Sequence, residues 1–245
     1  MSALERYHAL VAEQLARVVA TQAEAVAQAA GWLRDALRRD RFLYVFGTGH
    51  SHLLAEEVFY RAGGLARAVP ILDEPLMLHQ GAVRSTELER QPGYAAELLE
   101  RYPLAAGDLL VVASNSGRNP VPIELALGAR ERGARTVALV SRRHAAAAPS
   151  RHPSGDTLAD VVDLVLDNGG VAGDAALALP GLAQPVGPTS TIVGAFLLHA
   201  IVAQAAELLA LAGAPPEVYA SANLEGSAAH NAALLRRYQG RVPHL

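Results

Sequence analysis

The feature that most constrains the fold is an alternation of short apolar runs with segments long enough to be helices. The runs are apolar along their whole length, as in strands that are buried on both faces. Buried strands that alternate with helices predict a parallel sheet with helices on both sides. We therefore expect an α/β fold, a doubly wound parallel sheet in three layers. The predicted strands occupy residues 42–47, 66–72, 108–114, 135–141 and 161–167.

Helical patterns flank this predicted sheet. Residues 3–39 are rich in alanine, lack proline and space their apolar side chains at nearly helical intervals. Residues 189–213 form the most convincing helix, because Gly213 and Pro215 stop it, and residues 223–240 read as an amphipathic helix. We expect an N-terminal helical segment in 1–40, one α/β domain in 41–215 and a helical tail in 216–245.

The residue types that are missing exclude several kinds of chemistry. All 21 basic residues are arginine, so the chain has no primary amine side chain for a Schiff base, for pyridoxal phosphate or for a P-loop. Cysteine is also absent, which excludes disulfides, thiolate nucleophiles and cysteine-bound metals. The formal net charge of -3 without a basic block argues against a nucleic-acid partner.

The sequence also predicts where the protein resides. The N-terminus lacks the basic start and apolar core of a signal peptide. The longest apolar run, 192–203, is interrupted by Gly194 and His199 and is too short to span a bilayer. We expect a cytoplasmic protein with no membrane partner.

The first candidate ligand loop follows the first predicted strand, in the stretch LYVFGTGHSHLLAEEVF. Ser51 starts the next helix, where it can cap the helix or donate its hydroxyl to an anion. A dinucleotide site is an alternative, since Asp73 stands where that fold places an acidic residue, but His52 replaces the required third glycine. The candidate binding residues of this loop are Gly47, Gly49, His50 and Ser51.

The second candidate loop, VVASNSGRNPVPIELA, follows the third predicted strand. Pro120 suits the first position of a helix capped by the preceding residue. Free backbone N–H groups at such a helix start can bind a phosphate without any lysine, although serine and asparagine are also ordinary turn residues. The candidate phosphate-binding residues are Ser114, Asn115, Ser116, Gly117 and Asn119.

The third candidate loop opens the long apolar helix with Thr189, Ser190 and Thr191. One hydroxyl is enough to cap a helix, so three adjacent hydroxyls suggest a further role. Ligands of open parallel sheets bind at the carboxyl ends of the strands, where all three loops are expected. Together they favour a small, polyhydroxylated anion as ligand.

With SNSGRNP following FGTGHS by about one βαβ unit, the sequence resembles the SIS (sugar isomerase) domain family of phosphosugar-binding proteins. The family's phosphate loop, Ser-x-Ser-Gly-x-Thr/Ser, matches at Ser114, Ser116 and Gly117, with Asn119 where a hydroxyl is commoner. The resemblance implies a flavodoxin/Rossmann-like SIS fold in 41–215. The stretches GHSHLLAEEVFYRAGG, PILDEPLMLHQGA and SANLEGS resemble an uncharacterised bacterial branch of SIS domain-containing proteins more closely.

Sugar-phosphate isomerisation needs a base that moves a proton between two carbons and a group that assists ring opening. Glu57 and Glu56 are the candidate bases, and His79 or His50 the assisting group. A solvent-exposed pairing of the glutamates with Arg61 is the structural alternative. In related isomerases and etherases the catalytic Glu lies one turn further along, where this chain has Arg61.

The remaining histidines suggest no metal site, because they lack the spacing of metal ligands, and we expect no cofactor. His199 lies within the apolar FLLHAIV and is predicted to be a core or subunit-interface residue. His52 is predicted to be a helix residue. His230 and Asn231 resemble a C-terminal segment that closes over the sugar in some relatives.

Two classes of function remain open from the sequence. The chain is expected to be an isomerase-type enzyme, or an etherase or lyase, that acts on a phosphorylated sugar or amino sugar. The alternative is a non-catalytic phosphosugar sensor, which would act through a protein partner because residues 1–40 are too short and too weakly basic for a DNA-binding module. The apolar helices predict a homodimer or a larger homo-oligomer.

Overall fold

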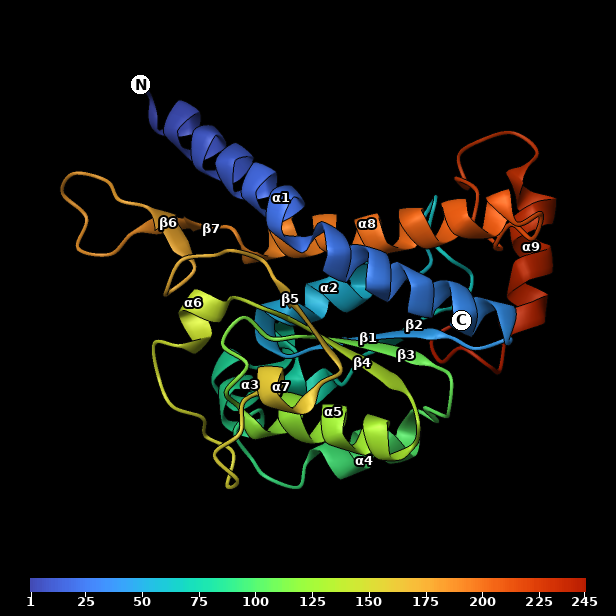
Figure 1. The fold of residues 1–245 in the computed structure, drawn as a ribbon, viewed down its shortest axis with the longest axis horizontal. Helices are drawn as coiled ribbons and strands as arrows, with labels where there is room; N and C mark the ends of the chain where they lie inside the picture. The colour runs from blue at the N-terminus through green and yellow to red at the C-terminus, as the bar shows by residue number, and fades with distance from the viewer.

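The computed structural model describes all residues, 1–245, and has the expected three-layer α/β architecture (Figure 1). The middle layer is a five-stranded sheet with the order β2-β1-β3-β4-β5, in which every neighbouring pair is parallel. The five strands that were predicted are all present. They are β1 (Leu43–Gly47), β2 (Ala68–Ile71), β3 (Leu109–Ala113), β4 (Arg135–Val140) and β5 (Leu164–Asp167).

Strands β1, β2 and β3 are buried on both faces, which explains why their sequences are apolar throughout. Every residue of β1, β2 and β3 is buried. Successive side chains of a strand point to opposite faces, so Leu43 and Val45 join one hydrophobic core while Tyr44 and Phe46 join the other. The sheet therefore separates two cores, each covered by helices.

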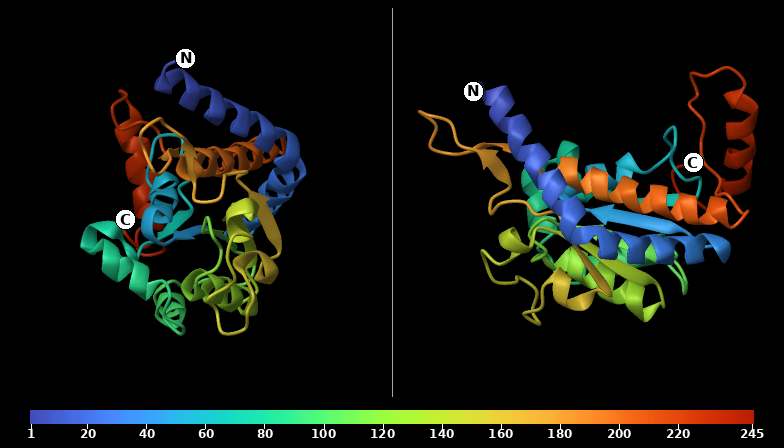
Figure 2. Two further views of the ribbon diagram at one scale, coloured as in Figure 1. Left: turned by 90° about the vertical axis from the view of Figure 1, so that its left-hand side faces the viewer. Right: turned by 45° about the horizontal axis from the view of Figure 1, so that its top comes forward.

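The helices form the two outer layers (Figures 1 and 2). The first core is covered by α1 (Ala3–Arg38), α2 (His52–Glu57) and α8 (Ser190–Leu211). The second core is covered by α3 (Ala82–Leu88), α4 (Ala95–Arg101), α5 (Pro120–Glu131), α7 (Leu158–Val161) and α9 (Ser227–Tyr238). The short elements are α6 (Arg142–Ala145) and three 3-10 turns, η1 (Gly49–Ser51), η2 (Glu74–Leu76) and η3 (Leu78–Gln80).

Helix α8 is longer than its uninterrupted apolar run suggests. It has 22 residues and a mean hydropathy of 1.9, so by length and composition alone it is long and apolar enough to cross a membrane, although the apolar run 192–203 within it is shorter. In the fold it packs on α1 and α2, and Leu197, Leu198 and Ile201 are buried in the core beneath it. Core helices of this kind are apolar on most of their surface.

Two segments project from the body of the domain (Figure 2). One is the N-terminal half of α1, and the other is a hairpin of β6 (Ala175–Leu177) and β7 (Val186–Pro188), which the sequence did not predict. The hydroxyl of Tyr7 donates to the carbonyl of Pro188 at 2.7 Å and joins the two projections.

The strand order determines where a ligand can bind. The chain passes from β1 outward to β2 on one side and then returns to β3 on the other side of β1. The loops after β1 and β3 therefore diverge at a topological switch point, which is the usual ligand crevice of open parallel sheets. The first and second candidate loops follow these two strands.

Candidate functional site

The first loop is held in a tight turn by its glycines. A Cβ atom at Gly47 would lie 2.4 Å from the backbone carbon and oxygen of Ser51, so no larger residue fits there without a shift. Gly49 has a φ of 54°, in the left-handed region that glycine tolerates. The turn closes with a hydrogen bond from the Ser51 N–H to the Thr48 carbonyl at 2.9 Å. It places Ser51 at the switch point.

Some polar groups of the second loop bond within the protein, and others are free to bind a ligand. The buried hydroxyl of Ser114 accepts the N–H of Gly117 at 3.2 Å, so it stabilises the turn itself. The amide oxygen of Asn115 accepts from the amide nitrogen of Asn168 at 2.9 Å. Ser116 is half-buried, and its backbone N–H donates to no backbone acceptor. Ser116 is thus the residue of this loop with the most unused hydrogen-bonding capacity.

Asn119 precedes α5 at the expected cap position, with Pro120 as the first helical residue. Its side chain, however, does not cap the helix. It is buried and accepts from Nη1 of Arg151 at 2.8 Å, while the N–H of Arg151 donates to the carbonyl of Arg118 at 2.7 Å. The segment around Arg151 is therefore hydrogen-bonded to the second loop.

The third loop is already occupied by a carboxylate. Oδ1 of Asp174 accepts the N–H groups of Thr189 and Ser190 at 3.2 and 2.9 Å, and Oδ2 accepts the Ser190 hydroxyl at 2.6 Å. Asp174 thus satisfies free donors at the N-terminus of α8 and complements the helix dipole. The hydroxyl of Thr189 is buried without a partner. Ser190 and Thr191 remain partly exposed.

Residues from all three loops surround one small pocket at the carboxyl edge of the sheet. The residues that line it come from α2, α8 and the ends of β3, β4 and β5. They are Ser51, Leu54, Ala113, Ser114, Asn115, Leu139, Asn168, Ser190 and Thr191. The structure therefore brings together one or more hydroxyls from each loop. The pocket itself has a volume of about 10 Å³, enough for a single water molecule, so a ligand would contact these hydroxyls from its mouth.

A larger pocket of about 360 Å³ adjoins the first one, because Leu54 and Thr191 line both. Its other lining residues are Leu53, Glu56, Glu57 and Ala195. The combined site places hydroxyls at one end and carboxylates at the other. This is the arrangement that a sugar phosphate would need if its phosphate and its reacting carbons are held apart.

Of the two glutamates, Glu57 has more hydrogen-bonding and charged neighbours. Its Oε1 lies 2.9 Å from Nε2 of His199 on α8, and the same oxygen is paired with Nη1 of Arg61 one turn along the chain. The hydrogen bond with His199 and the charge of Arg61 lower the pKa of Glu57 below its usual value. Glu57 is therefore an ionised carboxylate with a histidine in contact. Glu56 is exposed, and its nearest basic partner is His52 at 3.9 Å.

The predicted histidines of the first loop and of the 79–90 segment lie outside both pockets. His50 and His79 are exposed, and the rings of His79 and the buried His52 are 6.5 Å apart. In the tail, His230 contacts the Val218 carbonyl through Nε2 at 2.8 Å. Asn231 bonds the backbone of Ala220 through both its amide oxygen and its nitrogen. These two tail residues fix the turn before α9.

Sequence reasoning missed three residues of the site. His199 was predicted to be a core or subunit-interface residue; it is not in the core, because its side chain is 42% exposed in the single chain, and it contacts Glu57. Asn168 stands directly after the last predicted strand, a position that could have marked it as a site residue. Asp174 lies in a Gly-rich connector with no periodic pattern, and only the fold brings its carboxylate to α8.

A dinucleotide and a metal are both poorly supported by the geometry. Asp73, the acidic residue that a dinucleotide site would use, is buried, accepts the Tyr94 hydroxyl at 2.6 Å and is paired with Arg101. No group of three or more histidine, aspartate or glutamate side chains is placed to hold a metal ion.

Comparison with known proteins identifies the family. The SIS domain profile matches residues 6–141. A UPF0309 protein of Geobacillus thermodenitrificans is 43% identical over 242 residues, which cover 99% of this chain and 97% of that protein. A UPF0309 protein of Halalkalibacterium halodurans is 45% identical over 239 residues, covering 98% and 96%.

The fold resembles that of solved SIS-type structures. A phosphoheptose isomerase from Francisella tularensis superposes with a TM-score of 0.56 at 15% sequence identity, covering 84% of this chain and 98% of that one. The profile match over more than half of the chain and the UPF0309 relatives over nearly all of it agree with the loop geometry. The chain belongs to the SIS domain family and, within it, to the UPF0309 proteins.

Proposed function

We propose that this protein binds a phosphorylated sugar or amino sugar at the carboxyl edge of its sheet and isomerises it. The observation that carries the proposal is the shared wall of the two pockets: Thr191 lines the hydroxyl-rich pocket and also the pocket that contains Glu57. The phosphate would lie against the loops of Ser51 and Ser116, where hydroxyl and N–H donors are available. Its family and the phosphoheptose isomerase of similar fold support this substrate class.

In the proposed reaction an aldose is converted into a ketose, because a proton moves from C2 to C1 of the same sugar. The carboxylate of Glu57 takes the C2 proton, which leaves an enediolate, and the same proton is returned to C1. The proton of the C2 hydroxyl moves to the oxygen of C1 in the same conversion, and the candidate that carries it is His199, which contacts the carboxylate of Glu57. All atoms of the substrate are retained, so the step needs neither an oxidant nor a cofactor.

The sugar-binding half of the proposal is tested by thermal stabilisation and calorimetry with a panel of sugar phosphates and the matching unphosphorylated sugars. We expect saturable binding of a sugar phosphate that is weakened in Ser114→Ala/Ser116→Ala. The matched control is Thr21→Ala/Ser221→Ala, whose hydroxyls bond only to neighbours in the sequence and line neither pocket. Equal binding of phosphorylated and plain sugars, or unchanged binding in the loop variant, would reject this assignment.

A non-catalytic sensor is the second candidate. It is favoured by the pairing of Glu57 with Arg61, because a carboxylate with a lowered pKa is a weaker base. Saturable binding with no turnover of any bound sugar phosphate would favour the sensor over the isomerase. Release of a lactate or another leaving group from an amino-sugar phosphate would instead indicate an etherase or lyase.

We also propose that the protein forms a homodimer or larger homo-oligomer in the cytoplasm. Ile192 and Phe196 on α8 and Leu53 on α2 are large apolar side chains with 42%, 38% and 40% of their surface exposed. Burial of such side chains against a second copy would be favourable. Light scattering of the protein and of Phe196→Asp tests this, since a monomer in both would contradict it.

A further inference from the structure

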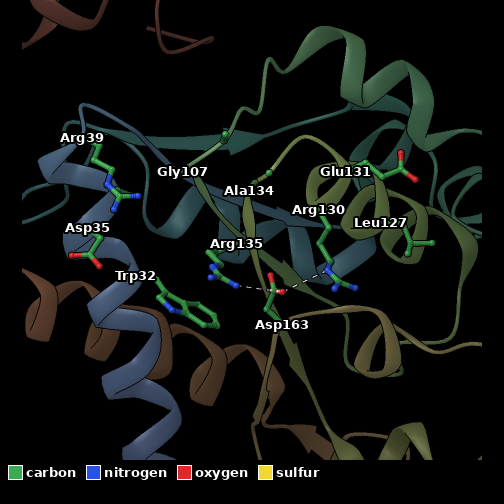
Figure 3. A pocket seen from close by; sticks show the side chains of 13 residues that line it. Trp32, Asp35, Arg39, Gly107, Leu127, Arg130, Glu131, Ala134, Arg135 and Asp163 are labelled. Carbon is green, nitrogen blue, oxygen red and sulfur yellow. Dashed lines mark ion pairs between the residues drawn. The ribbon is translucent and has the colours of Figure 1, made fainter.

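A large cavity lies at the opposite edge of the sheet from the candidate site. Its volume is about 840 Å³, within the range of small-molecule sites. Gly107 precedes β3 and Arg135 begins β4, so the cavity sits at the amino ends of the strands, between the end of α1 and the end of α5 (Figure 3). It shares no lining residue with either pocket of the candidate site.

Two guanidinium groups at this cavity are left without strong partners. Arg39, just after α1, forms no ion pair and caps no helix carbonyl with its side chain. Arg135 forms no hydrogen bond, and its nearest carboxylate oxygen, on Asp163, is 3.8 Å away. A guanidinium is a planar fork of donors that matches a carboxylate or phosphate.

The position of Arg135 is fixed by an aromatic ring. Its guanidinium carbon lies 5.3 Å from the ring centroid of Trp32, a cation–π contact. Figure 3 shows the two side chains next to each other, with Asp163 between Arg135 and Arg130. Ordering of this kind lowers the entropic cost of binding a ligand.

The acidic residues of the cavity offset the charge of these two arginines only in part. Asp163 accepts the N–H and the hydroxyl of Thr136 at 2.9 and 3.1 Å and lies 3.6 Å from Arg130. Asp35 is paired with its neighbour Arg34 at 2.8 Å. Asp163 is therefore shared between Arg130 and Arg135, and Glu131 also lines the cavity, so Arg39 is the guanidinium that an oxyanion from solution would meet without an ion-pair partner.

We propose that this cavity is a second ligand site, which binds a small organic oxyanion, a phosphate ester or a carboxylate, through Arg39 and Arg135 with its body near Trp32. The proposal does not depend on the phosphosugar site, because the two sites have no residue in common.

The protein carries its own probe for this binding, since Trp32 is its single tryptophan. Tryptophan fluorescence and isothermal titration calorimetry would be recorded with AMP, glycerol 3-phosphate and citrate, at constant ionic strength. Arg39→Gln and Arg135→Gln should each weaken binding about tenfold, because each removes a charged hydrogen bond to the ligand. Arg38→Gln is the matched control, because Arg38 is an exposed neighbour on α1 that does not line the cavity.

The outcomes separate the classes of ligand and the two sites. Binding of phosphate esters alone or of citrate alone would identify which oxyanion the site prefers. Binding that persists in Ser114→Ala/Ser116→Ala but is lost in Arg39→Gln/Arg135→Gln would place the ligand at the second site. The proposal would be overturned if none of the three probes gave a heat of binding. It would also be overturned if the Arg39→Gln/Arg135→Gln variant bound the probes as tightly as wild type.

Discussion

Nε2 of His199 lies 2.9 Å from Oε1 of Glu57, although the two residues are 142 positions apart in the chain. Glu57 ends the short helix α2, which follows the first ligand loop, and His199 belongs to α8, which follows the third. The pair therefore links two loops of the candidate site through the helices behind them. In the proposed reaction this contact favours Glu57 over Glu56 as the base and makes His199 a candidate for the assisting group beside His79 and His50.

Removal of either member of this pair should abolish most turnover. Glu57→Gln keeps the shape of the side chain but cannot accept a proton, so we expect kcat for isomerisation to fall about 10²–10⁴-fold. His199→Gln should lower kcat as well, with a smaller change in KM. Glu56→Gln is the control, since Glu56 makes no contact with His199. Activity equal to wild type in Glu57→Gln would exclude Glu57 as the base.

The same pair predicts a pH dependence of stability. The pKa of Glu57 is lowered in the folded state, so its contribution to the free energy of unfolding is complete above the ordinary glutamate pKa and is lost as the pH falls through the lowered value. Urea denaturation should therefore show wild type more stable than Glu57→Gln at neutral pH, with the difference shrinking in acid. A difference that grows in acid would contradict the assigned sign.

Gly47→Ala should damage the first loop, because the new methyl group would meet the backbone of Ser51. We expect a loss of about 1–3 kcal/mol in the free energy of unfolding, typical of overpacking, and weaker sugar-phosphate binding. Gly31→Ala is the matched control in the middle of α1, where nothing lies within 4 Å of the added atom. It should stabilise the protein by up to about 1 kcal/mol. Equal effects of the two substitutions would disprove the close approach at Gly47.

Asp174→Asn should destabilise the start of α8. The carboxylate accepts three hydrogen bonds there, and an amide retains the shape without the charge that complements the helix dipole. A loss of about 1 kcal/mol is expected in chemical denaturation. Glu24→Gln, an exposed acidic residue of α1, serves as the control. If both variants unfold at the same urea concentration, Asp174 does not stabilise α8.

The sequence by itself determined the sheet, its parallel strands and the loops that carry the hydroxyls. Strands such as β1 and β3 are apolar throughout because both faces are buried, and this pattern can be read without a structure. Gly47 ends β1, Ser51 follows shortly after it and Ser114 follows β3. These positions marked the three residues as part of ligand loops, because parallel strands end at one edge of the sheet, where ligands bind.

The tertiary structure alone decided which of these groups are free and which charged residues meet. Asn119 is engaged by Arg151, Ser190 by Asp174 and Glu57 by His199, through contacts between segments that are 16 to 142 residues apart. Periodicity describes which face of a strand or helix is apolar, but it has no information on which polar side chains approach each other across elements. For the same reason the cavity lined by Arg39 and Arg135 could not be predicted from the sequence, because it forms only where the end of α1 lies beside the start of β4.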